Sequence, residues 1–137
     1  MRIPAKLAAQ LAQLAEAAWP EEACALLVGH NDTITEIVPA PNVAVDKRAG
    51  FEIDPAVQFA LRRRLREQPR DGLLLGHWHS HPNGRAVPSA MDAAMIYEPG
   101  LLWLISAVQA GRADMPAAFR PQPQGGFASV DLQIEEA

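Results

Sequence analysis

Hydrophobic side chains recur at helical spacing near the start of the chain. Leu7, Leu11, Leu14 and Ala18 lie at i, i+4, i+7 and i+11, which places them on one face of an α-helix. A proline inside a helix removes a hydrogen bond and breaks the pattern. The sequence therefore predicts an amphipathic first helix that ends before Pro20.

A second helical pattern begins at Asp54, which can serve as the N-cap ahead of Pro55 at the first helical position. Its apolar stripe consists of Val57, Leu61 and Leu65. Arginines line most of the remaining surface, at positions 62, 63, 64 and 66. We interpret them as a solvated helix face, with an acidic partner surface as the less favoured alternative.

Short apolar or β-branched runs bounded by turn residues predict strands. They are residues 22–28, 33–38, 43–45, 51–53, 73–79, 101–108, 117–120 and 129–134. The first two flank a Gly-His-Asn-Asp turn and predict a hairpin. A short helix is expected from Ser89 to about Tyr97. Together these elements predict an α/β (α+β) fold, a single mixed β-sheet flanked by helices, in one domain of residues 1–137.

The composition narrows the class of protein. Of the 137 residues, 49% are hydrophobic and 20% are charged, which is typical of a folded soluble domain. A net charge of -4 disfavours nucleic acid as the main partner, because phosphate binding usually needs a basic face. No apolar run reaches the roughly 20 residues that span a bilayer. The one cysteine, Cys24, leaves no intrachain disulfide, so we expect a cytoplasmic protein without a membrane partner.

Three of the four histidines lie within five residues, at positions 77, 79 and 81. Alternate residues of a strand point the same way, so His79 and His81 can reach one ion. Zinc prefers imidazole and carboxylate ligands, and a catalytic site uses three of them plus water. Asp92 is the candidate third ligand, because the loop after His81 is long enough to fold back over the strand end.

A purely structural explanation exists for the same residues. Ser89 and Asp92 have the spacing of a capping box, in which the serine caps a helix and the acid returns the bond. A histidine pair in a strand is more often packed or exposed than metal-binding. From the residues alone both explanations stay open, since Ser89 can cap its helix and still offer its hydroxyl to a site.

The combined pattern resembles the JAMM motif of the JAB1/MPN/Mov34 zinc-metallopeptidase superfamily, in its compact prokaryotic form. The matching segment reads GHWHSHP from Gly76, followed by Ser89 and Asp92. An upstream segment, PEEACALLVG from Pro20, is similar to the family's first-strand glutamate motif, with Glu22 in the glutamate position. The sequence departs from the family at Ala25, where a glycine is usual, and at His77, where an aromatic or aliphatic residue is usual.

The resemblance implies a JAB1/MPN (deaminase-like) fold and one Zn²⁺ per chain, bound by His79, His81 and Asp92. It implies that Glu22 is the general base and acid and that Ser89 donates a hydrogen bond to the developing oxyanion. Glu21 competes with Glu22, but neighbours on a strand face opposite ways, and the spacing to Cys24 selects Glu22. We expect His77 to support or pack beside the ligands, and Cys24 to be buried and inert.

The implied activity is that of a zinc-dependent peptidase or isopeptidase. Its expected substrate is an amide bond after the C-terminal Gly-Gly of a ubiquitin-like sulfur-carrier protein. Two alternatives stay open: a catalytically silent MPN-type scaffold, or a zinc hydrolase acting on another substrate. Of the latter, a nucleobase deaminase is disfavoured because the chain lacks the Pro-Cys-x-x-Cys ligand pair.

Overall fold

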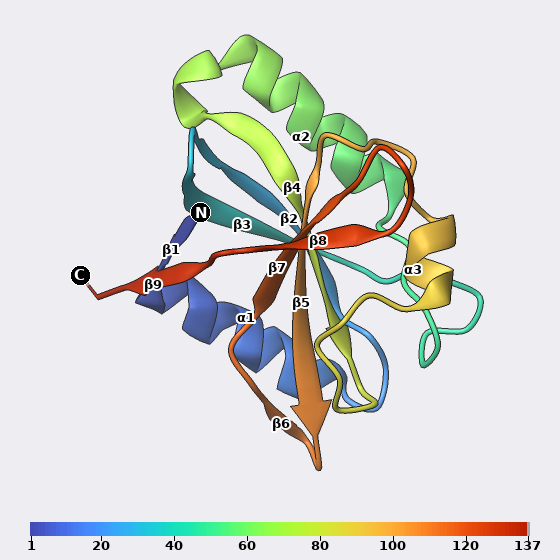
Figure 1. Cartoon of the computed structure of the whole chain (residues 1–137). Helices are drawn as coiled ribbons and strands as arrows, with labels where there is room; N and C mark the ends of the chain where they lie inside the picture. The colour runs from blue at the N-terminus through green and yellow to red at the C-terminus, as the bar shows by residue number, and fades with distance from the viewer. Residues whose placement is uncertain (137) are drawn as a thin grey trace.

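The computed structural model describes residues 1–136 and consists of a curled β-sheet with helices on both faces (Figure 1). The helices are α1 (Ala5–Ala18), α2 (Pro55–Glu67) and α3 (Ala90–Ala94), with a 3₁₀ turn at Pro69–Asp71. The strands are β1 (Arg2–Pro4), β2 (Cys24–His30), β3 (Thr33–Ala40), β4 (Leu73–His81), β5 (Leu102–Gln109), β6 (Arg112–Ala113), β7 (Ala117–Pro121), β8 (Phe127–Val130) and β9 (Gln133–Glu135). In these described residues, no helix has the length and apolar character that a bilayer crossing requires.

The sheet is mixed, as predicted. Its strand order is β8-β7-β5-β4-β2-β3-β1-β9, with β6 paired to β5. The β2–β3 hairpin is antiparallel, β2 pairs antiparallel with β4, and β4 pairs parallel with β5. This order puts β4, the strand of the histidines, in the interior of the sheet with a neighbour on each side.

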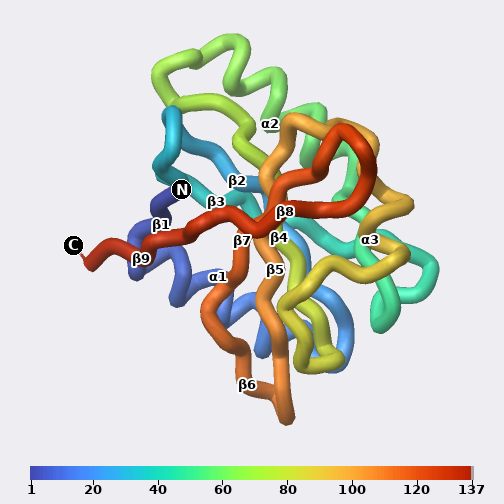
Figure 2. The backbone as a smooth tube through the Cα atoms, viewed as in Figure 1, coloured from blue at the N-terminus to red at the C-terminus, as the bar shows by residue number. Residues whose placement is uncertain are grey.

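The sheet curls, so that two strands consecutive in the chain form its two ends. Only Asp131 and Leu132 separate β8 at one end of the order from β9 at the other. Figure 2 shows the C-terminal segment passing from β8 to β9, which lies beside β1. The single strand predicted over residues 129–134 is therefore wrong, because the segment exchanges one partner strand for another halfway along its length.

Helix α1 covers one face of the sheet. Its buried residues are Ala8, Leu11 and Ala15, and they pack with Trp78 and Leu104 of the central strands. The apolar stripe predicted from leucine spacing is rotated slightly, because the small alanines lie deepest and allow a close approach to the sheet. Leu7 and Leu14 are partly buried at the edges of the same contact.

Helix α2 covers the opposite face through Leu61, which joins a second core cluster with Trp103 and Phe119. The predicted cap is confirmed: the Asp54 side chain accepts a hydrogen bond from the amide of Ala56 at 3.0 Å. Two of the arginines form ion pairs with neighbouring elements, Arg62 with Glu98 and Arg64 with Glu36, and Arg63 pairs with Glu67 within α2 itself. The interpretation as a solvated face is therefore incomplete, since part of this face ties α2 to the sheet and to the loop after α3.

Two further expectations differ from the structure. The strands predicted at residues 43–45 and 51–53 are absent, and residues 41–53 form a loop with one bridge, between Asn42 and Ile53. Helix α3 ends at Ala94 instead of continuing to about Tyr97, because Met95 and Ile96 turn in to pack on the second core cluster. Both segments matter for function, because they lie on the same side of the sheet as the histidines.

Candidate active site

Strand β4 sorts its side chains by parity. Trp78 points into the core beneath α1, so His77, His79 and His81 share the other face. The strand extends to His81, two residues beyond its predicted end. Because β4 is an interior strand, His79 is fully buried and His81 is 4% exposed. The sheet therefore presents two imidazoles side by side with little contact with solvent.

Three side chains with metal-binding atoms converge at the end of β4. His79 Nε2 lies 2.9 Å from His81 Nε2, and Asp92 Oδ2 lies 3.0 Å from the latter. Asp92 Oδ1 lies 3.3 Å from His79 Nε2. Ligands held at 2.0–2.1 Å around a tetrahedral zinc ion are separated by about 3.3 Å. The donor types and their spacing therefore fit a divalent metal such as zinc.

Each histidine is oriented by a neighbour. His81 Nδ1 lies 2.9 Å from the carbonyl oxygen of Arg85, so an Nδ1–H donor there leaves the Nε2 lone pair facing the cluster. The His79 ring stacks on Phe51, with centroids 4.1 Å apart and planes inclined by 15°. Among residues 1–136, His79 Nδ1 is buried without a hydrogen-bond partner. The orientation of the His79 ring is therefore set by packing, whereas that of the His81 ring is set by a hydrogen bond.

Asp92 is held by a complete capping box. The amide of Ser89 donates to Asp92 Oδ2 at 2.9 Å, and the amide of Asp92 donates to Ser89 Oγ at 3.0 Å. The structural and metal-binding explanations of this pair are therefore compatible, because the cap turns the carboxylate toward His79 and His81. Ser89 Oγ accepts one bond and still has its own hydrogen to donate.

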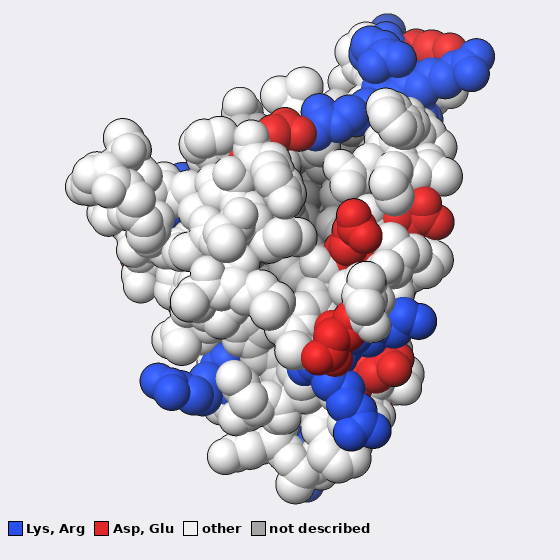
Figure 3. All heavy atoms as spheres, turned by 90° about the vertical axis from the view of Figure 1, so that its right-hand side faces the viewer, with Lys and Arg blue, Asp and Glu red and all other residues white. Residues whose placement is uncertain are grey.

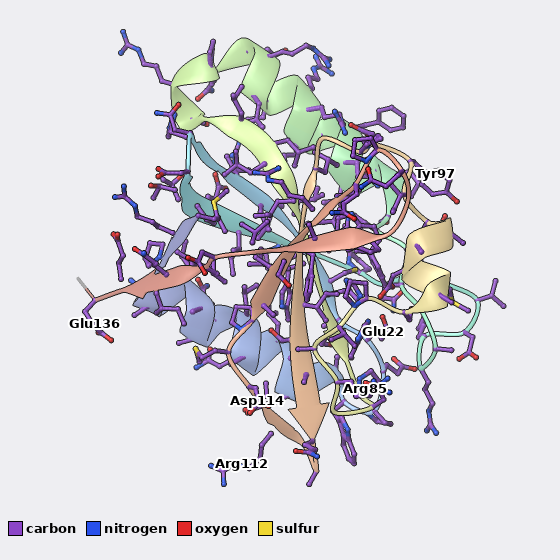
Figure 4. All side chains as sticks on the ribbon, in the orientation of Figure 1. Glu22, Arg85, Tyr97, Arg112, Asp114 and Glu136 are labelled. Atoms are coloured by element: carbon purple, nitrogen blue, oxygen red, sulfur yellow. The ribbon has the colours of Figure 1, made fainter. Side chains whose placement is uncertain are left out.

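Glu22 approaches the cluster from the segment that leads into β2, which starts two residues later than the predicted strand. Glu22 is 6% exposed, whereas Glu21 is exposed to solvent, so the two neighbours face opposite ways, as expected. Cys24 pairs directly with His79 across the sheet, which brings Glu22, two residues earlier, beside His81. Ligand atoms of Glu22, His79 and His81 lie within 4.8 Å of one another. Figure 4 shows Glu22 on the side of the sheet that carries α3 and the Arg85 loop.

Burial controls the electrostatics of these groups. Desolvation raises the pKa of Glu22 to about 8, although His81 opposes the shift. Desolvation also lowers the pKa of His79, so its imidazole is neutral and can ligate a metal. Burial alone would raise the pKa of Asp92, but hydrogen bonds from His79 and His81 outweigh it and hold that pKa well below its usual range.

The structure separates His77 and Cys24 from this cluster. His77 packs edge-on against Trp103, with centroids 4.4 Å apart, and burial lowers its pKa to about 3. The Cys24 thiol is directed at the carbonyl of Ala40, 3.5 Å away, and burial raises its pKa to about 12. His77 is thus a neutral packing group next to the ligand pair, and Cys24 is a protonated core residue.

Two hollows border the cluster. A cavity of about 290 Å³ lies over His77, Phe51 and Trp103, and its mixed apolar and polar lining includes Glu52 and Glu98. A groove of about 580 Å³ between α1 and the end of β3 reaches Glu22. Figure 3 shows the α3 side of the molecule, with a hollow near its centre, mostly uncharged walls and charged side chains mainly along the rim. An extended, largely uncharged chain segment suits such a surface.

Three residues beside the cluster are assigned no role by the motifs in the sequence. Phe51 stacks on His79, Ser80 lies between the two histidines, and Asn42 contacts the backbone of Glu22. The polar turn at Asn42 and the hydroxyl inside a buried strand at Ser80 were visible in the sequence. Their partners lie 20 and 57 residues away, and no local pattern encodes contacts over such distances.

A curled mixed sheet with a His-x-His pair, a capped aspartate and a buried glutamate just before the neighbouring strand defines the JAB1/MPN class. In a comparison with protein families, residues 4–121 match the prokaryotic homologs of the JAB domain. The chain belongs to this family.

Two curated relatives and two solved structures are similar to the chain. Over 88 residues it is 35% identical to the desampylase of Haloferax volcanii, covering 63% of this chain and 62% of the relative. Over 74 residues it is 36% identical to a probable TtuB-protein conjugate cleaving protease of Thermus thermophilus, covering 53% of this chain and 47% of the relative. The chain therefore matches about half to three fifths of each relative's length.

The solved structures agree on the fold. The solution structure of a Desulfitobacterium hafniense protein has a TM-score of 0.85 at 26% identity, over 99% of this chain and 93% of the other. A JAB1/MPN domain protein from Archaeoglobus fulgidus has a TM-score of 0.65 at 22% identity, over 98% of both chains. The predicted JAB1/MPN fold is confirmed.

Proposed function

We propose that the protein is a zinc-dependent metallopeptidase or isopeptidase, acting as one JAB1/MPN domain over residues 1–137. The observation that carries this proposal is the convergence of His79, His81 and Asp92 at 2.9–3.3 Å, with buried Glu22 beside them. A scaffold would gain nothing from burying two imidazoles and two carboxylates together, because unpaired buried polar groups cost stability.

His79, His81 and Asp92 would hold one zinc ion. Zinc bound there would lower the pKa of a water ligand and polarise the scissile carbonyl. Glu22 takes the proton from the attacking water and delivers it to the leaving amine, a role worth roughly 10²–10⁴ in rate. One carboxylate can serve both steps, because the proton that it takes from the water is the one that it later delivers.

Ser89 completes the reaction site. Its Oγ already accepts the Asp92 amide, so its own hydrogen is free to donate to the carbonyl oxygen as negative charge develops there. One such donor is worth about 10²–10³ in rate. The same serine therefore orients a metal ligand through its cap and stabilises the oxyanion through its hydroxyl.

The substrate that we propose is a ubiquitin-like sulfur-carrier protein, cleaved after its C-terminal Gly-Gly. The names of the two relatives, a desampylase and a TtuB-conjugate cleaving protease, support a protein conjugate of this class. The hollows beside the cluster, whose linings are uncharged apart from four glutamates and Lys47, offer room for a flexible diglycine tail. A single cysteine without an intrachain partner is in keeping with action in the reducing cytoplasm.

The test uses a ubiquitin-fold carrier with a short tail fused after Gly-Gly, and the same carrier joined through an isopeptide bond to lysine. The zinc-loaded protein is expected to cleave at least one of them, and a chelator is expected to stop cleavage. Asp92→Ala should lose most of its zinc, measured by elemental analysis, while the circular dichroism spectrum is unchanged. Full zinc occupancy in Asp92→Ala would refute the ligand set, and zinc-loaded protein without activity on either substrate would refute the substrate class.

Glu22 needs a separate experiment, because its carboxylate is also close enough to His79 and His81 to be a metal ligand. If Glu22 is the base, the Glu22→Gln variant retains zinc and its turnover falls by at least about 10². If Glu22 is a metal ligand, the same variant loses zinc together with activity. Glu21→Gln is the matched control, since the neighbouring glutamate is exposed, and it is expected to retain both.

A further inference from the structure

Glu22 lies just outside the regular sheet. Strand β2 begins at Cys24, so no ladder hydrogen bond fixes the backbone of Glu22. Its amide instead donates to the carbonyl oxygen of Lys47 at 2.7 Å. Within residues 1–136, its Oε1 is buried without a partner. The direction of the carboxylate therefore depends on how the backbone is held.

Two side chains hold the peptide unit between Glu22 and Ala23. Its carbonyl oxygen accepts a hydrogen bond from Asn42 Nδ2 at 2.9 Å. Its amide, that of Ala23, donates to Ser80 Oγ at 2.8 Å. Both polar groups of this one peptide are thus paired with side chains from distant parts of the chain.

Ser80 connects this peptide to the metal-ligand strand. It is fully buried and lies in β4 between His79 and His81. Its own amide donates to the carbonyl of Ala23 at 3.1 Å. A shift of the Glu22 backbone relative to the two histidines would break both bonds.

Asn42 connects the peptide to the loop of residues 41–53. Its Nδ2 also donates to the carbonyl of Gly50 at 3.1 Å. Its Oδ1 accepts from the amides of Ala44 and Glu52 at 3.0 and 3.1 Å. The side chain uses all four of its hydrogen-bonding positions, and it anchors the loop whose Phe51 stacks on His79.

We propose that Asn42 and Ser80 are positioning residues that clamp the Glu22–Ala23 peptide and so aim the Glu22 carboxylate at the metal-ligand cluster. The proposal rests on the proposed function, in which Glu22 is the base. A misplacement of about 1 Å can cost on the order of 10² in rate. The buried carboxylate is in particular need of such a clamp, because its Oε1 has no hydrogen bond of its own.

The test compares Asn42→Asp and Ser80→Ala with Ser106→Ala. Ser106 is a matched control, because it is also fully buried and pairs with Ser80 across β4 and β5, but its hydroxyl accepts from Trp78 Nε1 at 2.9 Å. Asn42→Asp is nearly isosteric but replaces the donor with an acceptor facing two carbonyls. Both clamp variants are expected to lower kcat by about 10–100-fold, with KM changed less than threefold and zinc still at one per chain.

Two readouts separate positioning from general damage. In the metal-free protein, hydrogen exchange of the Ala23 amide should quicken at least tenfold in Ser80→Ala and stay unchanged in Ser106→Ala. Ser80→Thr keeps a hydroxyl and should restore most of kcat. In a Glu22→Ala background, Ser80→Ala should lower the residual kcat by less than about twofold, because residues that act through one group are not additive.

The outcomes distinguish the two proposals. Full activity in Glu22→Ala would refute the role of Glu22 in the proposed function. Impaired Glu22→Ala with undiminished Asn42→Asp and Ser80→Ala would refute the clamp alone. Additive losses in the double variant, or loss of zinc from either clamp variant, would also overturn the clamp, because the residues would then act on something other than Glu22.

Discussion

Replacement of Glu22 by glutamine is predicted to stabilise the metal-free protein while it removes turnover. The Glu22 side chain is 6% exposed, and burial raises its pKa from 4.5 to about 8. The unfolded chain ionises near the lower value, whereas the folded protein keeps the proton up to the higher one. Between these values the folded state binds more protons, so the stability of the metal-free protein falls as pH rises from about 4.5 to 8.

The magnitude follows from the same linkage. Each pH unit of enforced protonation costs about 1.4 kcal/mol, so Glu22 costs about 3 kcal/mol at pH 7. Glutamine is neutral at every pH and avoids this cost. Its buried amide forfeits about 1–2 kcal/mol because it gains no new partner. The net gain at pH 7 is about 1–2 kcal/mol, or roughly 3–8 °C in Tm, and at pH 5 it disappears.

Urea unfolding with chelator present, followed by circular dichroism at pH 5 and pH 7, measures both quantities. Glu21→Gln is the control, because that exposed neighbour is expected to unfold like the unmodified chain at both pH values. A Glu22→Gln variant less stable than the unmodified chain at pH 7 would refute the reasoning. An equal stability difference at both pH values would refute it too, since the effect must follow the titration of one carboxyl.

Two further substitutions and one labelling experiment test the site and the strands that support it. Ser89→Ala should keep zinc and lower kcat by about 10²-fold, with a loss of about 0.5–2 kcal/mol on urea unfolding from the missing cap; full activity with the same loss of stability would leave Ser89 as a cap only. Gly76→Ala should fail to give a cooperative unfolding transition, because a Cβ there would overlap the Leu102 backbone on β5. The Cys24 thiol should react with an aromatic disulfide reagent at pH 8 only after denaturation, because burial raises its pKa to about 12; prompt reaction of the folded protein would contradict this.

Features whose hydrogen bonds are local were predictable from the sequence. Asp54 and Pro55 predicted the start of α2, and the spacing of Ser89 and Asp92 predicted the capping box. The parity of β4 placed His79 and His81 on one face, and the expectation that adjacent residues face opposite ways selected Glu22 over Glu21. In each example the physical cause acts within about four residues, so the order of residue types contains it.

Features that depend on partners distant in the chain were not predictable from the sequence. The apolar alternation of residues 129–134 continues across Asp131 and Leu132, but β8 pairs with β7 whereas β9 pairs with β1. Residues 43–45 and 51–53 have strand-like composition but belong to a loop, in which the side chain of Asn42 satisfies backbone groups that a ladder would have paired. Pairing across the sheet overrides local preference in both segments.

The sequence by itself therefore determined the chemistry of the cluster: two imidazoles at strand spacing, a capped carboxylate and a glutamate of defined parity. Only the tertiary structure decided how these groups meet. The curled sheet places β2 against β4, which brings Glu22 to His81 across 58 intervening residues. The same pairing sets Ser80 against Ala23, and the β2–β3 hairpin sets Asn42 against Glu22. Those contacts are fixed by strand order and burial, which belong to the whole chain, whereas the ligand types are fixed residue by residue.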